Sequence, residues 1–321
     1  MPTSVTECPS RPEAVSGVRR LLALLLLLTA AAVSVSAQSF SLPASYTLGS
    51  TTPGTGVAGD FNGDGKPDLA VNGGTSSISV MLNKGDGTFS VGGSYETDLR
   101  PTGVALGDFN KDGKPDLAVA NVSGGPTSAG SVSILVGKGD GMFQSAVNFA
   151  ADSPFSVVAV DLNADGNLDL VLKSSKSVTV LLGNGDATFR AGGSFAVGDN
   201  PYGIAVADFN KDGKPDVAAT NYNSGVSLLM GNGDGTFQPA VTLPFSSLNM
   251  YGPLTGIAAA DLNADGNQDI VALAPNASAA VVFMGKGDGS FQPAATYQLS
   301  RNVSDPWIAD FNGDGKLDIA V

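Results

Sequence analysis

A nine-residue, aspartate-rich pattern occurs six times in the chain, and its residue types are those that bind a hard cation. The first copy is Asp60-Phe61-Asn62-Gly63-Asp64-Gly65-Lys66-Pro67-Asp68. Every copy has Asp at positions 1, 5 and 9, Asn at position 3 and Gly at position 6. Ca²⁺ takes its ligands from such side-chain and backbone oxygens, and the Gly permits the positive φ of a sharp bend. We therefore predict about one Ca²⁺ per loop, up to six in all.

The predicted metal positions are the alternate residues 1, 3, 5, 7 and 9 of each loop, where side-chain and backbone oxygens are available. A set of metal-free turns is the alternative, because Asp, Asn and Gly favour turns in any case. A plain turn has no need of three neighbouring carboxylates, which favours the cation. The predicted positions are Asp60, Asn62, Asp64, Lys66, Asp68, Asp108, Asn110, Asp112, Lys114, Asp116, Asp161, Asn163, Asp165, Asn167, Asp169, Asp208, Asn210, Asp212, Lys214, Asp216, Asp261, Asn263, Asp265, Asn267, Asp269, Asp310, Asn312, Asp314, Lys316 and Asp318.

The segments on either side of these loops are typical of strands. Residues 104–107 precede the second loop and residues 117–120 follow it, and both are short apolar runs. Such runs are too short for helices, whereas an EF-hand loop lies between helices and ends in a Glu at position 12. The pattern therefore predicts a β-hairpin whose tip surrounds the ion.

The acidic charge is concentrated in the predicted loops. The formal net charge is −13, and 18 of the 30 acidic residues are loop aspartates. Without residues 1–37 the net charge would be −14, and six Ca²⁺ would bring it to about −2. A charge of this sign argues against nucleic acid as a partner, since nucleic-acid binding depends on basic residues.

The repeats predict an all-β propeller. Loop starts are 47 to 53 residues apart, and a second turn, Gly-Asp followed by Gly and an aromatic residue, keeps the same register. Periods of this length with hairpin turns predict four-stranded propeller blades. In the second repeat we expect strands near 103–108, 116–121, 131–136 and 142–149. Six repeats are visible and the last is incomplete. Ala187 replaces a turn Gly, which predicts either a strained turn or a turn of another type.

The D-x-N-x-D-G-x-x-D loops, the G-D-G-T-F turns and the G-V-A-x-x-D-F/L-N strands resemble FG-GAP or VCBS repeats. This is the blade unit of the integrin alpha-chain N-terminal β-propeller and its bacterial relatives. The resemblance covers about residues 40–321. The resemblance implies a propeller of seven blades, whereas this chain has only six copies of the loop. It also implies a fold that hosts adhesion modules, lectins and enzyme-associated domains.

Both ends of the sequence carry an expectation. Arg19-Arg20, the apolar run from Leu21 and the small residues before Gln38 predict a signal peptide over residues 1–37. A retained membrane anchor is the alternative. Residues 38–321 are the predicted propeller domain, and residues 40–46 resemble the fourth strand of a blade. We expect the chain to be C-terminally truncated, because it ends after the second strand of the sixth repeat. We expect a secreted, extracellular or cell-surface protein with no stable membrane span after cleavage.

The composition excludes several classes of enzyme. The chain has no His, and its one Cys, Cys8, lies within the predicted signal peptide. Ser-His-Asp triads, thiol nucleophiles and His-ligated zinc are therefore excluded. We expect a protein that is not an enzyme, with a polysaccharide lyase that uses Lys or Arg as the remaining catalytic alternative.

The predicted strand order places the loops on two faces, because successive connections alternate between the ends of a blade. The face opposite the metal loops collects aromatic and polar residues that can contact a sugar or a protein. Packing between blades is the alternative for these rings. The residues are Arg100, Asn121, Tyr202, Tyr222, Tyr251 and Trp307. In Asn200-Pro201-Tyr202 and Asp305-Pro306-Trp307 the aromatic follows Pro, which predicts equivalent positions. The sequence favours a calcium-binding adhesion or recognition module for an extracellular protein or glycan, with a calcium-dependent lectin as the alternative.

Overall fold

The computed structural model describes residues 55–72, 74–122, 130–198, 200–222, 225–243, 254–300 and 305–321. The chain divides into two units, Met1–Ser45 and Tyr46–Val321, and every described residue belongs to the second. The predicted signal peptide, the strand-like segment 40–46 and Tyr251 lie outside the described residues. No helix in the described ranges is long and apolar enough to cross a membrane.

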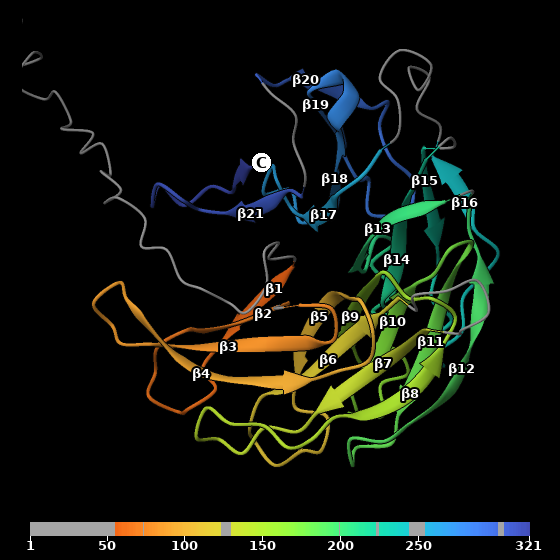
Figure 1. Ribbon diagram of the computed structural model, residues 1–321. Coiled ribbons are helices and arrows are strands. Elements are labelled where there is room, and N and C mark those ends of the chain that lie inside the picture. The colour runs from red at the N-terminus through yellow and green to blue at the C-terminus, as the bar shows by residue number, and fades with distance from the viewer. Residues whose placement is uncertain are drawn as a thin grey trace, which may run out of the picture. The chain divides into compact units, whose positions relative to one another are not determined.

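The described residues form five four-stranded antiparallel sheets and one two-stranded sheet, which follow one another along the chain (Figure 1). The first sheet contains β1 (Gly56–Gly59), β2 (Asp68–Asn72), β3 (Ser77–Asn83) and β4 (Phe89–Glu96). The second contains β5 (Pro101–Gly107), β6 (Asp116–Asn121), β7 (Gly130–Leu135) and β8 (Val147–Ala151). The third contains β9 (Ser156–Val160), β10 (Asp169–Lys173), β11 (Ser177–Gly183) and β12 (Phe189–Ala196).

The remaining sheets repeat this order. The fourth contains β13 (Pro201–Ala207), β14 (Asp216–Asn221), β15 (Gly225–Leu229) and β16 (Val241–Leu243). The fifth contains β17 (Ile257–Ala260), β18 (Asp269–Ala274), β19 (Ala279–Phe283) and β20 (Ala295–Gln298), with the 3₁₀ turn η1 (Pro275–Ala277) between β18 and β19. The sixth contains β21 (Trp307–Ala309) and β22 (Asp318–Ala320).

Burial changes from strand to strand within each sheet, and the sequence explains the change. Every residue of β6, β10, β14 and β18 is buried, which matches their nearly continuous apolar runs. The fourth strands are largely exposed: all four residues of β20 are exposed, and most of β12 is exposed or half-buried. The second and third strands therefore supply most of the core.

The first strands bring consecutive sheets together. β1 contacts β5, β5 contacts β9, β9 contacts β13, β13 contacts β17, and β17 contacts β21. Five hydrophobic clusters lie between and within these sheets. This is the blade arrangement of a β-propeller, so the predicted all-β architecture with four strands per blade is confirmed.

The two repeated motifs meet across the junctions between sheets. Phe61 at loop position 2 packs edge-to-face against Phe143 of the next repeat, with ring centroids 5.4 Å apart. The pairs Phe109–Phe189 and Phe209–Phe291 repeat this contact at 5.6 and 5.8 Å. The backbone oxygen of Phe61 also accepts a hydrogen bond from the Gly141 amide. In these three turns the aromatic residue therefore joins one blade to the next.

Two expectations about the second and third repeats have different outcomes. The fourth strand of the second repeat was expected near 142–149, but β8 begins only at Val147. Phe143 instead forms an isolated bridge with Gly137, and the Gln144 amide donates to the Val136 oxygen, which interrupts regular pairing. The predicted strain at Ala187 is confirmed, because this residue has φ of 61° where the equivalent turn residues are glycines.

Candidate functional site

Each predicted metal loop forms the tip of the hairpin between the first and second strands of its sheet. In the second loop, Asp108 Oδ1 accepts the Asp112 amide at 3.1 Å and Asp108 Oδ2 accepts the Gly113 amide at 2.8 Å. Asn110 Oδ1 also accepts the Asp112 amide, at 3.0 Å. The side chains at positions 1 and 3 therefore stabilise the loop by accepting hydrogen bonds from its backbone amides.

The loop backbone is left-handed at two positions. The Gly at position 6 has φ between 78° and 83° in all six loops, as the sequence predicts. Position 4 also has positive φ, including 59° at Lys111 and 56° at Ala164, where a side chain makes this conformation costly. This second bend could not be predicted from the residue types, because Gly occupies position 4 in only two of the copies.

The aspartate at position 9 connects the loop to the next strand. Asp116 is fully buried; its Oδ2 accepts the Phe109 amide at 2.9 Å and its Oδ1 accepts the Gly137 amide at 2.7 Å. Asp169 and Asp216 make the same pair of hydrogen bonds, to Leu162 and Gly183 and to Phe209 and Gly231 respectively. This carboxylate therefore has a structural role that the sequence analysis did not assign to it.

Burial raises the pKa of the position-9 carboxylates in the second to fifth loops. For Asp116 the loss of solvent is the largest cause; the two backbone amides oppose it, and the nearby carboxylates of Asp112 and Asp108 add to the increase. The pKa is also raised, by the same causes in the same order, for Asp169, Asp216 and Asp269. The carboxylates of one loop are therefore close enough to repel one another, which a bound cation would offset.

The donor set of the loops fits Ca²⁺ in its chemistry. Each carboxylate oxygen that accepts one amide keeps a second lone pair for a cation. Within the described residues, however, no three His, Cys, Asp or Glu side chains converge on one point as in a formed metal centre. In three loops the position-7 lysine ammonium lies 3.4 to 3.7 Å from the position-5 carboxylate, as for Lys114 and Asp112. The loops thus supply suitable oxygens, while lysine neutralises part of their charge.

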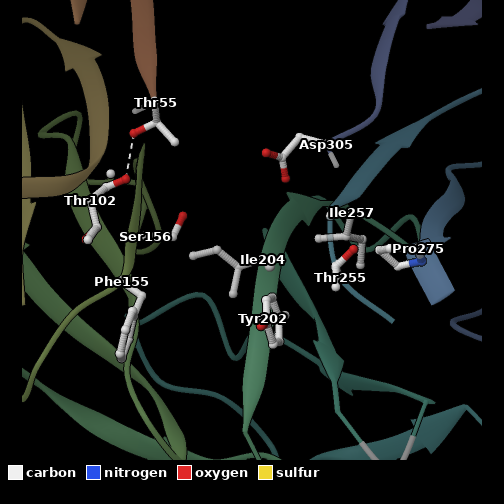
Figure 2. Close-up of a pocket in the computed structure, with 13 residues that line it drawn as sticks. Thr55, Thr102, Phe155, Ser156, Tyr202, Ile204, Thr255, Ile257, Pro275 and Asp305 are labelled. Carbon is white, nitrogen blue, oxygen red and sulfur yellow. Dashed lines mark hydrogen bonds between the residues drawn. The ribbon is translucent and has the colours of Figure 1, made fainter. Parts of the chain in front are cut away.

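A cavity of about 550 Å³ lies where the first strands begin (Figure 2). Its lining comes from all six sheets and combines hydroxyl groups, two aromatic rings, apolar side chains and one carboxylate. The lining residues are Thr55, Thr102, Gly103, Phe155, Ser156, Tyr202, Gly203, Ile204, Thr255, Gly256, Ile257, Pro275 and Asp305.

The cavity and the metal loops lie at opposite ends of the first strands. In β5, Thr102 lines the cavity near the start of the strand, and the loop beginning at Asp108 follows its end. A seven-residue strand such as β5 is about 20 Å long, so the cavity and the metal loop are about this far apart. The cavity therefore lies on the face on which the predicted strand order places the aromatic residues.

The predicted ligand-face residues are not all found at the cavity. Tyr202 lines it and is 52% exposed, and Tyr222 stacks on Tyr202 with ring centroids 6.4 Å apart. Arg100 is exposed in the turn before β5, with φ of 58°, and does not line the cavity. Asn121 was expected on this face but is buried; its amide donates to Ser131 and Ser133 instead of facing solvent.

Trp307 and Tyr202 do not occupy equivalent positions, contrary to the expectation. The last aspartate of the sixth loop, Asp318, pairs with Ala309, and Trp307 pairs with Ala320 two residues further on. The corresponding position in β13 is Ala205, which pairs with Ala218, so Tyr202 lies three residues earlier. Pro306 lies four residues before Asp310, whereas Pro201 lies seven residues before Asp208, and counting from the Pro therefore gave the wrong register. Trp307 is 67% exposed and does not line the cavity.

Lys173 is a feature that the sequence analysis missed. It is the last residue of β10 and is only 6% exposed. Its Nζ lies 3.9 Å from the centre of the Phe155 ring and 5.7 Å from the centre of the Tyr202 ring, both of which line the cavity. A lysine that ends an otherwise apolar buried strand, Asp169-Leu-Val-Leu-Lys, is the signal that could have identified it.

We expect the protein to become more stable with rising pH through the titration of Lys173. Burial lowers the pKa of this amine to about 8, below that of the unfolded chain, so the unfolded state holds the proton more tightly. Between about pH 8 and 10.5 the free energy of unfolding should therefore rise, by about 2 kcal/mol after solvent screening.

Urea denaturation across this pH range measures the effect, with Lys173→Met as the comparison. The variant should lack this increase and be more stable than the wild type at pH 7. The exposed Lys176, in the turn that follows β10, gives a matched control. A Lys173→Met variant with the same pH profile as the wild type would contradict the assignment.

Comparisons with known proteins place the fold in a family. The family model of FG-GAP-like repeats matches residues 60–119, 161–219, 208–272 and 261–321. No curated protein matches the chain.

Two solved structures are similar to this chain to different degrees. A lectin of Agrocybe aegerita is 22% identical with a TM-score of 0.59, over 84% of this chain and 74% of the lectin chain. Its structure is described as the basis of specific recognition of non-reducing terminal N-acetylglucosamine. The Tc holotoxin pore of Photorhabdus luminescens is 19% identical with a TM-score of 0.44, over 83% of this chain and 13% of that one, and is too distant to support an argument. Since the matched repeats cover more than half of the sequence, this protein belongs to the FG-GAP-like repeat family of β-propellers.

Proposed function

We propose that this protein is an exported, calcium-binding recognition module that binds carbohydrate in the cavity at the start of the first strands. The sequence favoured a protein-adhesion role, with a lectin as the alternative. The shape and lining of the cavity support the lectin alternative, because a protein partner does not require a concave site of this depth.

The cavity lining is the observation that carries this proposal. A volume of about 550 Å³ lies within the range of small-molecule sites and accommodates one or two sugar rings. Tyr202 and Phe155 are 52% and 39% exposed, so the ring surface that Lys173 and Tyr222 leave uncovered is available for contact with the C–H groups of a sugar. Ser156, Thr255 and Asp305 add hydroxyl and carboxylate oxygens elsewhere in the lining of the same cavity, and these can bind sugar hydroxyls.

The Agrocybe aegerita lectin lends limited support to the choice of ligand. Its recognition of N-acetylglucosamine indicates that a propeller of this fold can bind sugar. At 22% identity the comparison extends to the fold alone, so the proposed site rests on the cavity of this chain.

Calcium has a structural role in this proposal. The loops lie about 20 Å from the cavity along the first strands, which is too far for an ion in a loop to contact a ligand there. Each ion would instead join the ends of two strands through the carboxylates at positions 1, 5 and 9. Export by a signal peptide over residues 1–37 would bring the protein into calcium-rich surroundings.

Catalysis is not part of the proposed function. Of the residues lining the cavity, the titratable side chains are Tyr202 and Asp305, from different sheets. A polysaccharide lyase would release unsaturated sugar products, and an assay for these products tests that alternative.

A glycan array followed by calorimetric titration tests the proposed function. Tyr202→Ala should weaken binding at least tenfold, because it removes a ring that stacks on the sugar. Tyr297→Ala is the matched control, since Tyr297 is 55% exposed but lies on the outer strand β20. Binding of no glycan, together with attachment to deglycosylated cells, would instead support a protein ligand.

We expect Trp307→Ala to leave both the melting temperature and sugar binding nearly unchanged. Trp307 is 67% exposed and lies outside the cavity, so its removal creates no internal void. Loss of a buried Trp would cost about 3–5 kcal/mol. Thermal denaturation distinguishes the two cases, and a large decrease in melting temperature would show that the ring packs between blades.

A further inference from the structure

The ammonium group of Lys173 lies behind the cavity wall without an anionic partner among the described residues. Its contacts there are the faces of Phe155 and Tyr202, at 3.9 and 5.7 Å. The salt bridges of the described residues join lysines and aspartates of the metal loops only. A buried cation without a counter-charge is costly, and an anion that approaches it is correspondingly favoured.

Lys173 lies at a position of the repeat where two other blades use a side chain to bond to the next blade, and where Ala120 and Leu273 stand in the remaining two. The equivalent residues four positions after the loop's last aspartate include Asn72 and Thr220. Asn72 Nδ2 donates to the Pro101 oxygen at 3.2 Å, and Thr220 Oγ1 donates to the Thr255 oxygen at 2.6 Å, each in the next sheet. Lys173 also extends to the next sheet but meets the Tyr202 ring and no carbonyl oxygen there. At this position the third repeat thus carries a charged side chain. Two other repeats carry a neutral side chain that donates a hydrogen bond to a carbonyl oxygen.

The charges around the cavity are arranged asymmetrically. Lys173 lies behind the wall formed by Phe155 and Tyr202. Asp305, the one acidic residue of the lining, lies apart from these two rings, beyond Ile204 and near Thr255 and Ile257 (Figure 2). A ligand in the cavity would therefore meet a cation behind one wall and hydrogen-bond acceptors at another.

We infer that the cavity selects an acidic sugar, a pyranose ring that carries one carboxylate. The inference rests on the proposed carbohydrate-binding function and adds the class of sugar. The ring stacks on Tyr202 or Phe155, the carboxylate points toward the wall that covers Lys173, and the hydroxyls on the far side of the ring donate to Asp305. The single carboxylate of such a sugar would balance the single positive charge of Lys173, whereas a neutral sugar would leave that charge uncompensated.

Calorimetric titration of the calcium-loaded protein with glucuronate, glucose and acetate tests this inference. The wild type should bind glucuronate about tenfold more tightly than glucose, which is the effect of a partly screened charge pair across an aromatic wall. Acetate alone should bind at least tenfold more weakly than glucuronate, because it has no ring to stack. Glucose 6-sulfate shows whether a sulfate can replace the carboxylate; equal or tighter binding would overturn the assignment to a carboxylate.

Lys173→Met removes the charge and keeps an unbranched side chain only one atom shorter, so it should abolish the preference for glucuronate and leave glucose binding unchanged. Lys176→Met removes an exposed lysine three residues away and should keep the preference. Melting curves establish that both variants are folded, and Lys173→Gln replaces Lys173→Met if the latter is not.

The possible outcomes separate the inference from the function on which it rests. Equal affinity of the wild type for glucuronate and glucose, or a preference that persists in Lys173→Met, would overturn the inference and leave the carbohydrate-binding function intact. Binding of none of these sugars would overturn both.

Discussion

Excess EDTA is expected to lower the melting temperature of this protein by about 20 °C, or to unfold it at room temperature. A loop that binds at about 0.1 mM in calcium of about 1 mM gains roughly 1.4 kcal/mol by mass action. Six such loops contribute about 8 kcal/mol, which is comparable to the whole stability of a domain. Differential scanning calorimetry with and without EDTA measures the effect.

The structure supplies the physical reason for this expectation. In each loop the carboxylates repel one another, and the pKa of Asp116, Asp169, Asp216 and Asp269 is raised, first by burial and then in part by these neighbours. A divalent cation removes the repulsion at several points of the fold at once. Added Ca²⁺ should restore the melting curve after EDTA, and added Na⁺ at equal ionic strength serves as the control. A curve that EDTA leaves unchanged would contradict the proposed calcium binding.

Asp116→Ala should cost about 3 kcal/mol of unfolding free energy even without calcium, because it leaves two buried amides without an acceptor. These are the amides of Phe109 and Gly137, which now donate to Asp116 at 2.9 and 2.7 Å. Release of the buried charge offsets part of the loss. Urea denaturation in calcium-free buffer measures the change.

Asp112→Ala is the matched control in the same loop. Asp112 is exposed and accepts the Lys114 amide at 3.0 Å, so its loss should cost under about 1 kcal/mol without calcium. With calcium, each variant should lose about one bound ion in a calorimetric titration. Asp98→Ala, outside the loops, should keep the full stoichiometry. Equal stability of the two loop variants in calcium-free buffer would show that Asp116 has no structural role beyond metal binding.

Much of the fold could be predicted because its signals are local. The loop from Asp60 to Asp68, the Gly-Asp turns and the short apolar runs each specify a hairpin through the conformations of a few adjacent residues. Their regular spacing then gave four strands per blade. The start of β8 at Val147 was missed because irregular pairing around Phe143 depends on the neighbouring strand and not on the local sequence.

By itself the sequence determined the repeat, the strand order, the loop composition and the face on which Tyr202 lies, because hairpin connections must alternate between the ends of a blade. Features that depend on contacts between residues far apart in the sequence were decided only by the tertiary structure. Asp116 connects to Gly137 only when the second and third strands pair, and Lys173 meets Tyr202 only when the third and fourth blades pack together. The register of Trp307, in contrast, was already contained in the sequence, because Trp307 and Ala205 both lie three residues before the first aspartate of a loop.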